Sequence, residues 1–190
     1  MKSVIPEITV RKDVKQAQLA IGFRTFGVED KRIFVFTVLD AIMGRGMSSR
    51  LFVEVREKRG LSYDISSRFQ AFHGHGMWAI SAGVDVAKKD VALKVILKEI
   101  DRIRTRKVSA AELKRVKEFL TGNFKLAHER VISKLFYHGS TLLSFGRLIP
   151  TEEQIAAVKA VTADDILFVA QEVLKDDVRA ISWVLPNEEK

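Results

Sequence analysis

Two side chains seven residues apart, Arg56 and Tyr63, have types and a spacing that could serve chemistry. Arg56 belongs to a basic run that stops at Gly60, as helix ends often do, and Tyr63 opens an alternating run typical of a strand. A tight helix-to-strand corner places both heads close enough to converge on one ligand. A phenol can stabilise a developing oxyanion, and a guanidinium can donate to carbonyls or a carboxylate. The structural alternative is that Arg56 completes a helix end and Tyr63 packs at a strand start; Arg59 is the rival arginine.

A hydrolytic zinc site needs about three protein ligands, and the histidines are the next candidates for chemistry. The chain has His73, His75, His128 and His138, and none of them stands in His-x-x-Glu-His or His-Glu-x-x-His. His73 and His75 share a face if they lie on a strand and could take a metal from solution, although such a pair is more often a polar turn beside glycines. The absence of cysteine excludes thiolate zinc sites, disulfides and cysteine catalysis. We therefore predict no metal or cofactor bound by this chain, and no zinc-dependent hydrolysis by the chain alone.

The corner is positioned by a glycine turn and a short helix. Gly44 and Gly46 permit backbone angles that other residues resist, and Ser48 or Ser49 can cap the helix by accepting from a backbone N–H. The apolar residues that follow recur at helical spacing: Leu51, Phe52 and Val55. The glycine loop also invites a phosphate-cradle interpretation, but it lacks the lysine-serine ending and the longer glycine pattern of a P-loop. A tight helix–helix turn is the better interpretation.

The remaining pattern predicts an α+β domain with a largely antiparallel sheet and helices packed on one face. Strands are expected at 16–23, 63–71, 77–84 and 178–185, with a hairpin between the second and third. Helices are expected at 33–43, after Asp85, from Ser109 onward, from Thr151 and from Thr162 to 174, with Asp85, Ser109 and Thr162 as caps. The long segment after Ser109 should break near Gly139 or end at Gly146. Its inward residues are expected to be Leu113, Val116, Leu120, Phe124, Ala127 and Val131. We assign residues 1–13 to a linker, 14–186 to the domain and 187–190 to a tail.

Composition narrows the class of protein. The chain has 190 residues, is 47% hydrophobic and carries a net charge of +8, which suits one globular domain. Its basic residues are interspersed with acids and no nucleic-acid-binding signature is present, so we expect a solvated basic surface with a bias toward acidic partners. No apolar run approaches the about 20 residues that span a bilayer, and residues 1–6 do not form a secretory signal. We expect a soluble protein of unknown compartment with neither nucleic acid nor membrane as its partner.

The string from Gly46 to Tyr63, GMSSRLFVEVREKRGLSY, is long and specific. It resembles the second half-domain of the insulinase, pitrilysin and mitochondrial-processing-peptidase superfamily of zinc peptidases. In that family the catalytic half carries His-x-x-Glu-His, and the metal-free half carries an arginine seven residues before a tyrosine, the spacing of Arg56 and Tyr63. The similarity covers about residues 16–185 and implies a mostly antiparallel sheet with its helices on one face.

The resemblance implies a function as well as a fold. It implies that this chain is the metal-free half of a zinc metallopeptidase, closing one wall of a peptide-holding chamber while a partner domain holds the zinc. Arg56 and Tyr63 are then implied to contact the peptide substrate near the scissile carbonyl, with Gly44, Gly46 and Arg59 as further substrate contacts. The alternative within the same superfamily is a catalytically inactive scaffold or interaction subunit. Part of the apolar segment with Phe136, Tyr137, Leu142 and Phe145 either meets the partner half-domain or is simply buried.

Overall fold

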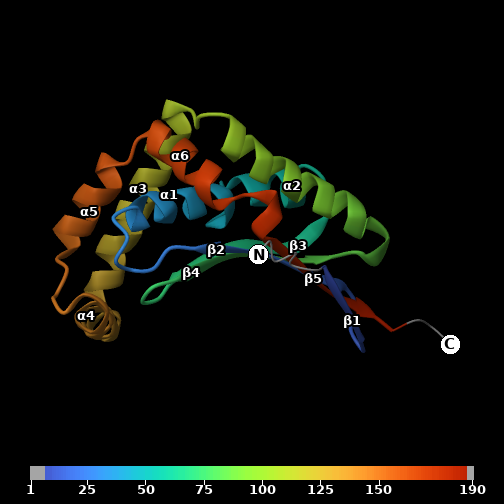
Figure 1. Cartoon of the computed structure of the whole chain (residues 1–190), viewed down its shortest axis with the longest axis horizontal. Helices are drawn as coiled ribbons and strands as arrows, with labels where there is room; N and C mark the ends of the chain where they lie inside the picture. Colours follow the sequence, from blue (N-terminus) through green and yellow to red (C-terminus); the bar gives the residue numbers. More distant parts are fainter. Residues whose placement is uncertain (1–6, 188–190) are drawn as a thin grey trace.

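The computed structural model describes residues 7–187, which form one sheet with α-helices stacked on one of its faces (Figure 1). The five strands are β1 (Ile8–Lys12), β2 (Ala17–Thr25), β3 (Ser62–Ala71), β4 (Gly76–Val84) and β5 (Arg179–Pro186). Their order is β1-β5-β2-β4-β3. Only β1 and β5 run parallel, and the other three neighbouring pairs are antiparallel. The predicted α+β class is confirmed, and β3 is an edge strand.

Six α-helices cover the sheet, in the order α1 (Ile33–Gly44), α2 (Lys89–Thr105), α3 (Ala110–Glu129), α4 (Val131–Phe145), α5 (Thr151–Ala160) and α6 (Ala163–Val173). A six-residue π-helix, η1 (Phe52–Glu57), precedes β3, and single turns of 3-10 helix lie at Val86–Lys88 and Asp176–Val178. The predicted caps form at Asp85, which accepts from Ala87 N, and at Ser109, which accepts from Glu112 N. At Thr162 a reciprocal capping box with Asp165 starts α6. None of the helices within residues 7–187 combines the length and apolar character needed to cross a bilayer.

The core lies between the sheet and α1, the most buried helix. Phe36, Leu39 and Met43 of α1 are fully buried, and they meet Ile21 of β2 and Trp78 of β4. The Phe36 ring lies edge-on to the Trp78 ring at 6.0 Å, a geometry that aromatic pairs favour. Along β2 and β4, every other side chain points into this core, so the side chains between them point away from the helices. That second face of the sheet carries no helix (Figure 1).

The structure corrects four expectations about local structure. Residues 8–12, expected as linker, form β1, because the alternating Ile8 and Val10 suit a strand beside β5. Asn187, expected in the tail, donates from its N–H to Lys12 O at 3.1 Å, so the hydrogen bonding between β1 and β5 extends to this residue. The rest of the predicted linker and tail, residues 1–6 and 188–190, lies outside the described range. The long helix breaks at Arg130, whose extended backbone separates α3 from α4. The break turns Val131 out of the core, and Ala127 is exposed as well.

The fourth correction concerns the start of the helical turn before η1. Neither Ser48 nor Ser49 caps it, because the Ser49 hydroxyl donates to Gly46 O at 2.8 Å instead of accepting from a backbone N–H. The end of the segment is as expected: Gly60 has a left-handed backbone with φ +57°, and its N–H donates to Arg56 O at 2.9 Å. Gly146 likewise ends α4 with φ +65°.

Candidate functional site

A β-bulge sets the orientation of Tyr63. Ser62 pairs with Val84 and Asp64 pairs with Gly83, so Tyr63 is the extra residue of the edge strand β3. Strict alternation would place Tyr63 on the same face as buried Ile65, but its side chain is 80% exposed. Ser62 anchors the bulge, because its buried hydroxyl lies 2.7 Å from Asp64 O and 2.8 Å from Gly83 O. The phenol is therefore presented to solvent at the start of β3.

Arg56 lies in the π-helix η1. The wide turn is closed by Lys58 N donating to Val53 O at 3.0 Å, five residues back, and by Leu61 N donating to Val55 O at 3.0 Å. These bonds fix the path from Arg56 to the first residue of β3. The Arg56 side chain is exposed, and its guanidinium carbon lies 4.8 Å from the centroid of the Phe52 ring, within the cation–π range. In the described part of the chain no acid or carbonyl pairs with it, so its donors remain available.

Arg59 is differently placed from Arg56. Its Nη1 donates to Glu54 O at 2.6 Å and to Glu54 Oε2 at 2.7 Å, so this guanidinium is committed to the helix it follows. Together with Lys58, Arg59 lowers the pKa of Glu54, the Lys58 hydrogen bond having the larger effect. Arg59 lines a hollow of about 380 Å³ beside α2, with Glu99 and Arg102. Its role as a substrate contact remains a prediction.

Gly44 and Gly46 line a broad groove of about 1010 Å³ at the β3 edge. A Cβ on Gly44 would lie 2.4 Å from Ser67 N, so the end of α1 packs directly on the backbone of β3. Gly46 has φ +85° and faces the ring of Phe119. The remaining lining residues come mainly from β3 and β4: Thr37, Asp40, Arg45, Ser66, Ser67, Arg68, Phe69, Gln70, Met77, Ala79 and Ser81. The structure thus brings the two glycines together in one groove along β3, while Arg56, Arg59 and Tyr63 are not among its lining residues.

A buried acid that the sequence did not single out supports the groove from below. Asp40 of α1 is 3% exposed, and its Oδ1 accepts from Ser67 Oγ at 2.6 Å and from Trp78 Nε1 at 2.8 Å. Its Oδ2 lies 3.8 Å from Arg45 Nε, next to Gly44. One carboxylate therefore joins α1, β3, β4 and the glycine loop. The signal in the sequence is an acid within an otherwise apolar helix, which requires a buried partner.

The glycine loop is also fastened to α3. Arg50 and Glu112 form a two-bonded ion pair, with both distances 2.8 Å and both side chains largely buried. Arg115 adds a hydrogen bond from its Nη2 to Ser48 O at 3.2 Å. These contacts join residues more than sixty positions apart and hold the loop, η1 and β3 in one rigid corner.

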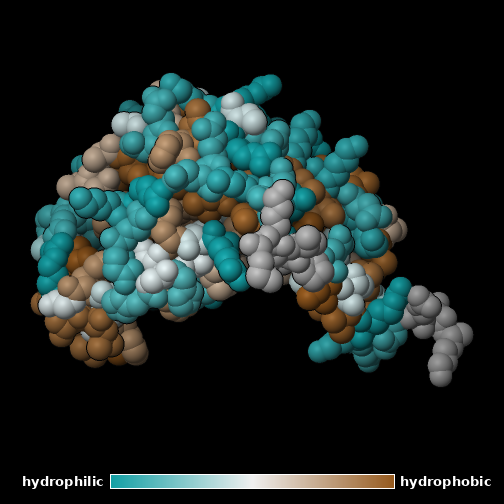
Figure 2. Space-filling model, in the orientation of Figure 1, coloured by the Kyte–Doolittle hydropathy of each residue, from teal (hydrophilic) through white to brown (hydrophobic). Residues whose placement is uncertain are grey.

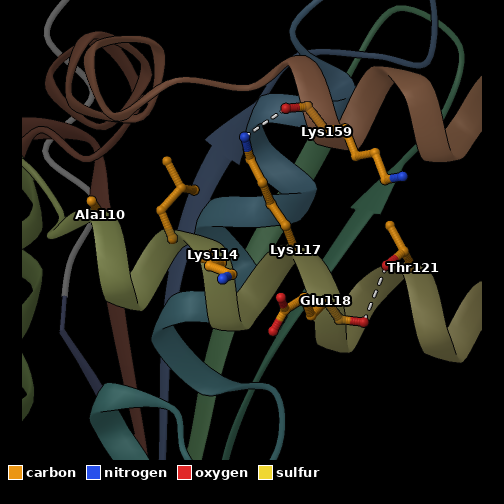
Figure 3. A pocket seen from close by; sticks show the side chains of 7 residues that line it. Ala110, Lys114, Lys117, Glu118, Thr121 and Lys159 are labelled. Carbon is orange, nitrogen blue, oxygen red and sulfur yellow. Dashed lines mark hydrogen bonds between the residues drawn. The ribbon is translucent and has the colours of Figure 1, made fainter.

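A second hollow, of about 360 Å³, lies between α3 and α5 (Figure 3). It is lined by three lysines, but Lys117 donates from Nζ to Lys159 O at 2.6 Å and so occupies the carbonyl end of α5. Thr121 bonds back to Glu118 O within its own helix. The side chains here support the helix packing and supply no nucleophile or acid–base pair, so this hollow is not the candidate site.

The residues that the structure describes do not form a zinc site of their own. Within the described residues no three His, Cys, Asp or Glu side chains converge. His73 Nδ1 lies 2.6 Å from Glu29 Oε1, and His75 Nδ1 lies 3.1 Å from His73 O, so these two imidazoles are used in a turn. The side chain of His128 lies outside the described part. No chemical step on this chain is therefore assigned to a metal.

The His73–Glu29 pair predicts a pH-dependent stability. Hydrogen bonds from the His73 imidazole to Glu29 and to the Leu143 backbone raise the pKa of His73 above 6.5. Hydrogen bonds to the Glu29 carboxylate from the Glu29 backbone, from Gly74 N–H and from His73 lower the pKa of Glu29 below 4.5. The stability that His73 contributes is fully present below its unfolded-state pKa of 6.5, and it is lost as the pH rises through the higher folded-state pKa. The stability that Glu29 contributes is fully present above its unfolded-state pKa of 4.5, and it is lost as the pH falls through the lower folded-state pKa.

We expect the gain in melting temperature from this pair to be largest between about pH 4.5 and 6.5. It should vanish in Glu29→Gln. Melting curves across pH, with His73→Asn and the double variant, measure the coupling. Equal pH profiles for the wild type and Glu29→Gln would show that the pair contributes nothing.

Comparison with known proteins places this corner in a family. The sequence model described as Peptidase M16 inactive domain matches residues 4–120, more than half of the chain and all of the corner. The chain belongs to the M16 peptidase family. Within that family it is the inactive domain, which agrees with the resemblance seen in the sequence.

Named relatives agree with this assignment, and solved structures share the fold. The chain is 34% identical over 180 residues to an uncharacterized zinc protease of Rickettsia felis and 28% identical over 181 residues to one of Bacillus subtilis, covering 94% and 95% of this chain. A conserved protein of Enterococcus faecalis shares the fold with a TM-score of 0.86 at 28% identity, over 99% of this chain and 43% of that one. A peptidase M16 inactive domain of Pseudomonas fluorescens shares the fold with a TM-score of 0.81 at 20% identity, over 97% of this chain and 45% of that chain. The chain spans less than half the length of the relatives, 43% and 44% for the two zinc proteases.

Proposed function

We propose that this chain is the metal-free half of a zinc metallopeptidase and forms one wall of its peptide-binding chamber. Zinc is held by a partner half, on the same parent chain or on a separate subunit. Tyr63 and Arg56 contact the peptide near the scissile bond, the phenol donating to the carbonyl oxygen as it acquires negative charge and the guanidinium binding neighbouring carbonyls. The observation that carries the proposal is the bulge at Tyr63, which turns a phenol outward seven residues after an exposed arginine, in the corner matched by the M16 inactive-domain model.

The uncovered face of the sheet supports the role of a chamber wall. Its exposed side chains are mostly small or polar, which suits contact with a peptide and water rather than with a packed layer: Gln18, Ala20, Arg24, Ser66, Arg68, Gln70 and Ser81. The groove of about 1010 Å³ opens along β3 from this face. Both features lie on the same strand as Tyr63. A peptide following β3 therefore passes from the groove toward the phenol.

An inactive scaffold of the same superfamily is the second candidate. A chain of complex III2 from Candida albicans shares this fold with a TM-score of 0.83 at 19% identity, a likeness that extends to the fold alone. The scaffold role requires neither an exposed phenol nor an unpaired arginine. The two candidates therefore differ in what the Arg56 side chain does.

Arg56 and Arg59 provide a matched pair of substitutions that tests the proposal. The chain is combined with its zinc-bearing half, and peptide hydrolysis is measured. We expect Arg56→Ala to lower kcat/KM by about 10- to 100-fold, the equivalent of one hydrogen bond from a charged donor. Arg59→Ala should lower kcat/KM less than Arg56→Ala does, because the Arg59 guanidinium is held by Glu54; a loss as large as that of Arg56→Ala would support Arg59 as a substrate contact. Activity unaffected by Arg56→Ala, or an assembly that hydrolyses no peptide, favours the scaffold.

A further inference from the structure

Helix α4 is amphipathic, but its apolar face points to solvent and its polar face points to the rest of the domain. The side chains that it turns toward the rest of the domain are polar or small, and Thr141 is 5% exposed. The outward positions recur at helical spacing and are large and apolar: Val131, Ile132, Leu135, Phe136, Leu142 and Leu143. Of these, Val131 is 85%, Phe136 73% and Leu143 84% exposed. A surface helix normally has the opposite arrangement, so this stripe is built for a contact that the domain does not supply.

The polar side of α4 attaches it firmly enough to fix the stripe. Tyr137 OH donates to Ile149 O at 3.0 Å, and burial raises the pKa of this phenol to about 12. The body of the helix packs mainly on α3. Leu148, just beyond the helix, extends the apolar surface and is 53% exposed. Figure 2 shows hydrophobic side chains gathered at the end of the molecule where Figure 1 places α4.

We propose that this stripe, the outward face of α4 with Leu148, is the docking surface for the zinc-bearing half. The identity of the partner rests on the proposed function. The length of the relatives supplies the occupant, because 43–44% of the two zinc proteases corresponds to this chain and the larger remainder must pack somewhere. The rim indicates its charge: Arg130 and Lys134 are exposed cations beside the stripe, so the partner presents acidic groups around an apolar centre.

The charge of the chain favours the zinc-bearing half over a second copy as the occupant of the stripe. A two-fold contact between copies brings the same basic rim against itself on a chain of net charge +8, which is unfavourable.

The test uses a matched set of exposed apolar residues. Phe136→Glu and Leu143→Glu change the stripe, and Phe168→Glu changes an isolated phenylalanine of α6 that is 57% exposed. Each variant and the tagged zinc-bearing half are purified separately, and the affinity between them is measured by titration calorimetry. We expect each stripe variant to weaken binding by about 30-fold or more, as for a central interface residue, and Phe168→Glu to bind within about threefold of wild type. Unchanged melting temperatures confirm folding.

The outcomes separate this inference from the proposed function. Tyr63→Phe should bind the zinc-bearing half with wild-type affinity, so a defect in turnover and a defect in assembly are read independently. Stripe variants that bind as tightly as wild type overturn the docking surface, whatever happens to turnover. Concentration-dependent dimers of this chain that are lost in Leu143→Glu assign the stripe to a second copy. Flotation of the wild-type chain with anionic vesicles, lost in the same variant, assigns it to a membrane surface; either result overturns the inference.

Discussion

Replacing Tyr63 by phenylalanine should lower kcat of the assembled peptidase by about 10²- to 10³-fold while KM changes little. This is the usual cost of removing one oxyanion-directed donor, the role proposed for Tyr63, because such a hydroxyl interacts more strongly with the transition state than with the bound peptide. The phenyl ring and the bulged backbone remain. The side chain is 80% exposed, so the fold should be unaffected. Steady-state hydrolysis of a peptide by the reconstituted assembly, with the melting temperature measured in parallel, gives the answer.

The other tyrosine provides the control for this experiment, since the chain has only two. Tyr137→Phe removes the hydroxyl that donates to Ile149 O, so we expect a loss of about 1 kcal/mol in unfolding free energy and unchanged kcat. The two substitutions are chemically identical and should have opposite signatures. If Tyr63→Phe retains kcat within about threefold of wild type, Tyr63 is not the donor to the oxyanion, and the scaffold becomes the better function.

The fold class, most of the strands and helices, and three side-chain-capped starts followed from local patterns in the sequence. Those patterns act over a few residues, as at Thr162, where Asp165 completes the capping box. The bulge at Tyr63 is different, because it depends on how β3 pairs with β4 across a hairpin. Alternation alone would bury Tyr63 with Ile65, and the sequence contains no local feature that marks the extra residue. The resemblance identified the residue, but only the pairing explains why it is exposed.

Long-range contacts account for most of what the sequence could not predict. Gly44 was expected as a permissive turn and a substrate contact, but its missing side chain also allows the end of α1 to pack against Ser67 N of β3. Nothing in the local sequence distinguishes Arg50 from the other cations, because its partner Glu112 lies on α3, 62 positions further along the chain. The helical segment ends at Gly146 as expected, but its break lies at Arg130 and not near Gly139, and no local feature of the sequence marks Arg130. Such contacts join elements that no short window of sequence relates.

Asp40 should be the most sensitive polar residue of the support beneath the groove. Asp40→Ala leaves the Ser67 hydroxyl and the Trp78 N–H without their acceptor in a buried site, at about 1–3 kcal/mol for each stranded donor. We expect a total loss of about 3 kcal/mol in unfolding free energy, which lowers the melting temperature of a domain of this size by about 10 °C. Thermal and urea unfolding, monitored by the fluorescence of the two buried tryptophans, Trp78 and Trp183, would measure it. The damage should also reach the site, because Ser67 lies beneath Gly44 and three strand positions from Asp64 of the bulge.

Asp40→Asn separates the acceptor from the charge. The amide keeps an oxygen for Ser67 and Trp78 but loses the negative charge 3.8 Å from Arg45 Nε, a pair half-exposed on the arginine side. We therefore expect a loss of less than about 1 kcal/mol, in line with a partly exposed ion pair. If Asn costs as much as Ala, the carboxylate acts through Arg45 and the charge holds the glycine loop. If neither variant changes stability, the hydrogen bonds from Ser67 and Trp78 do not fasten β3 and β4 to α1, and the groove must be held by the Arg50–Glu112 pair instead.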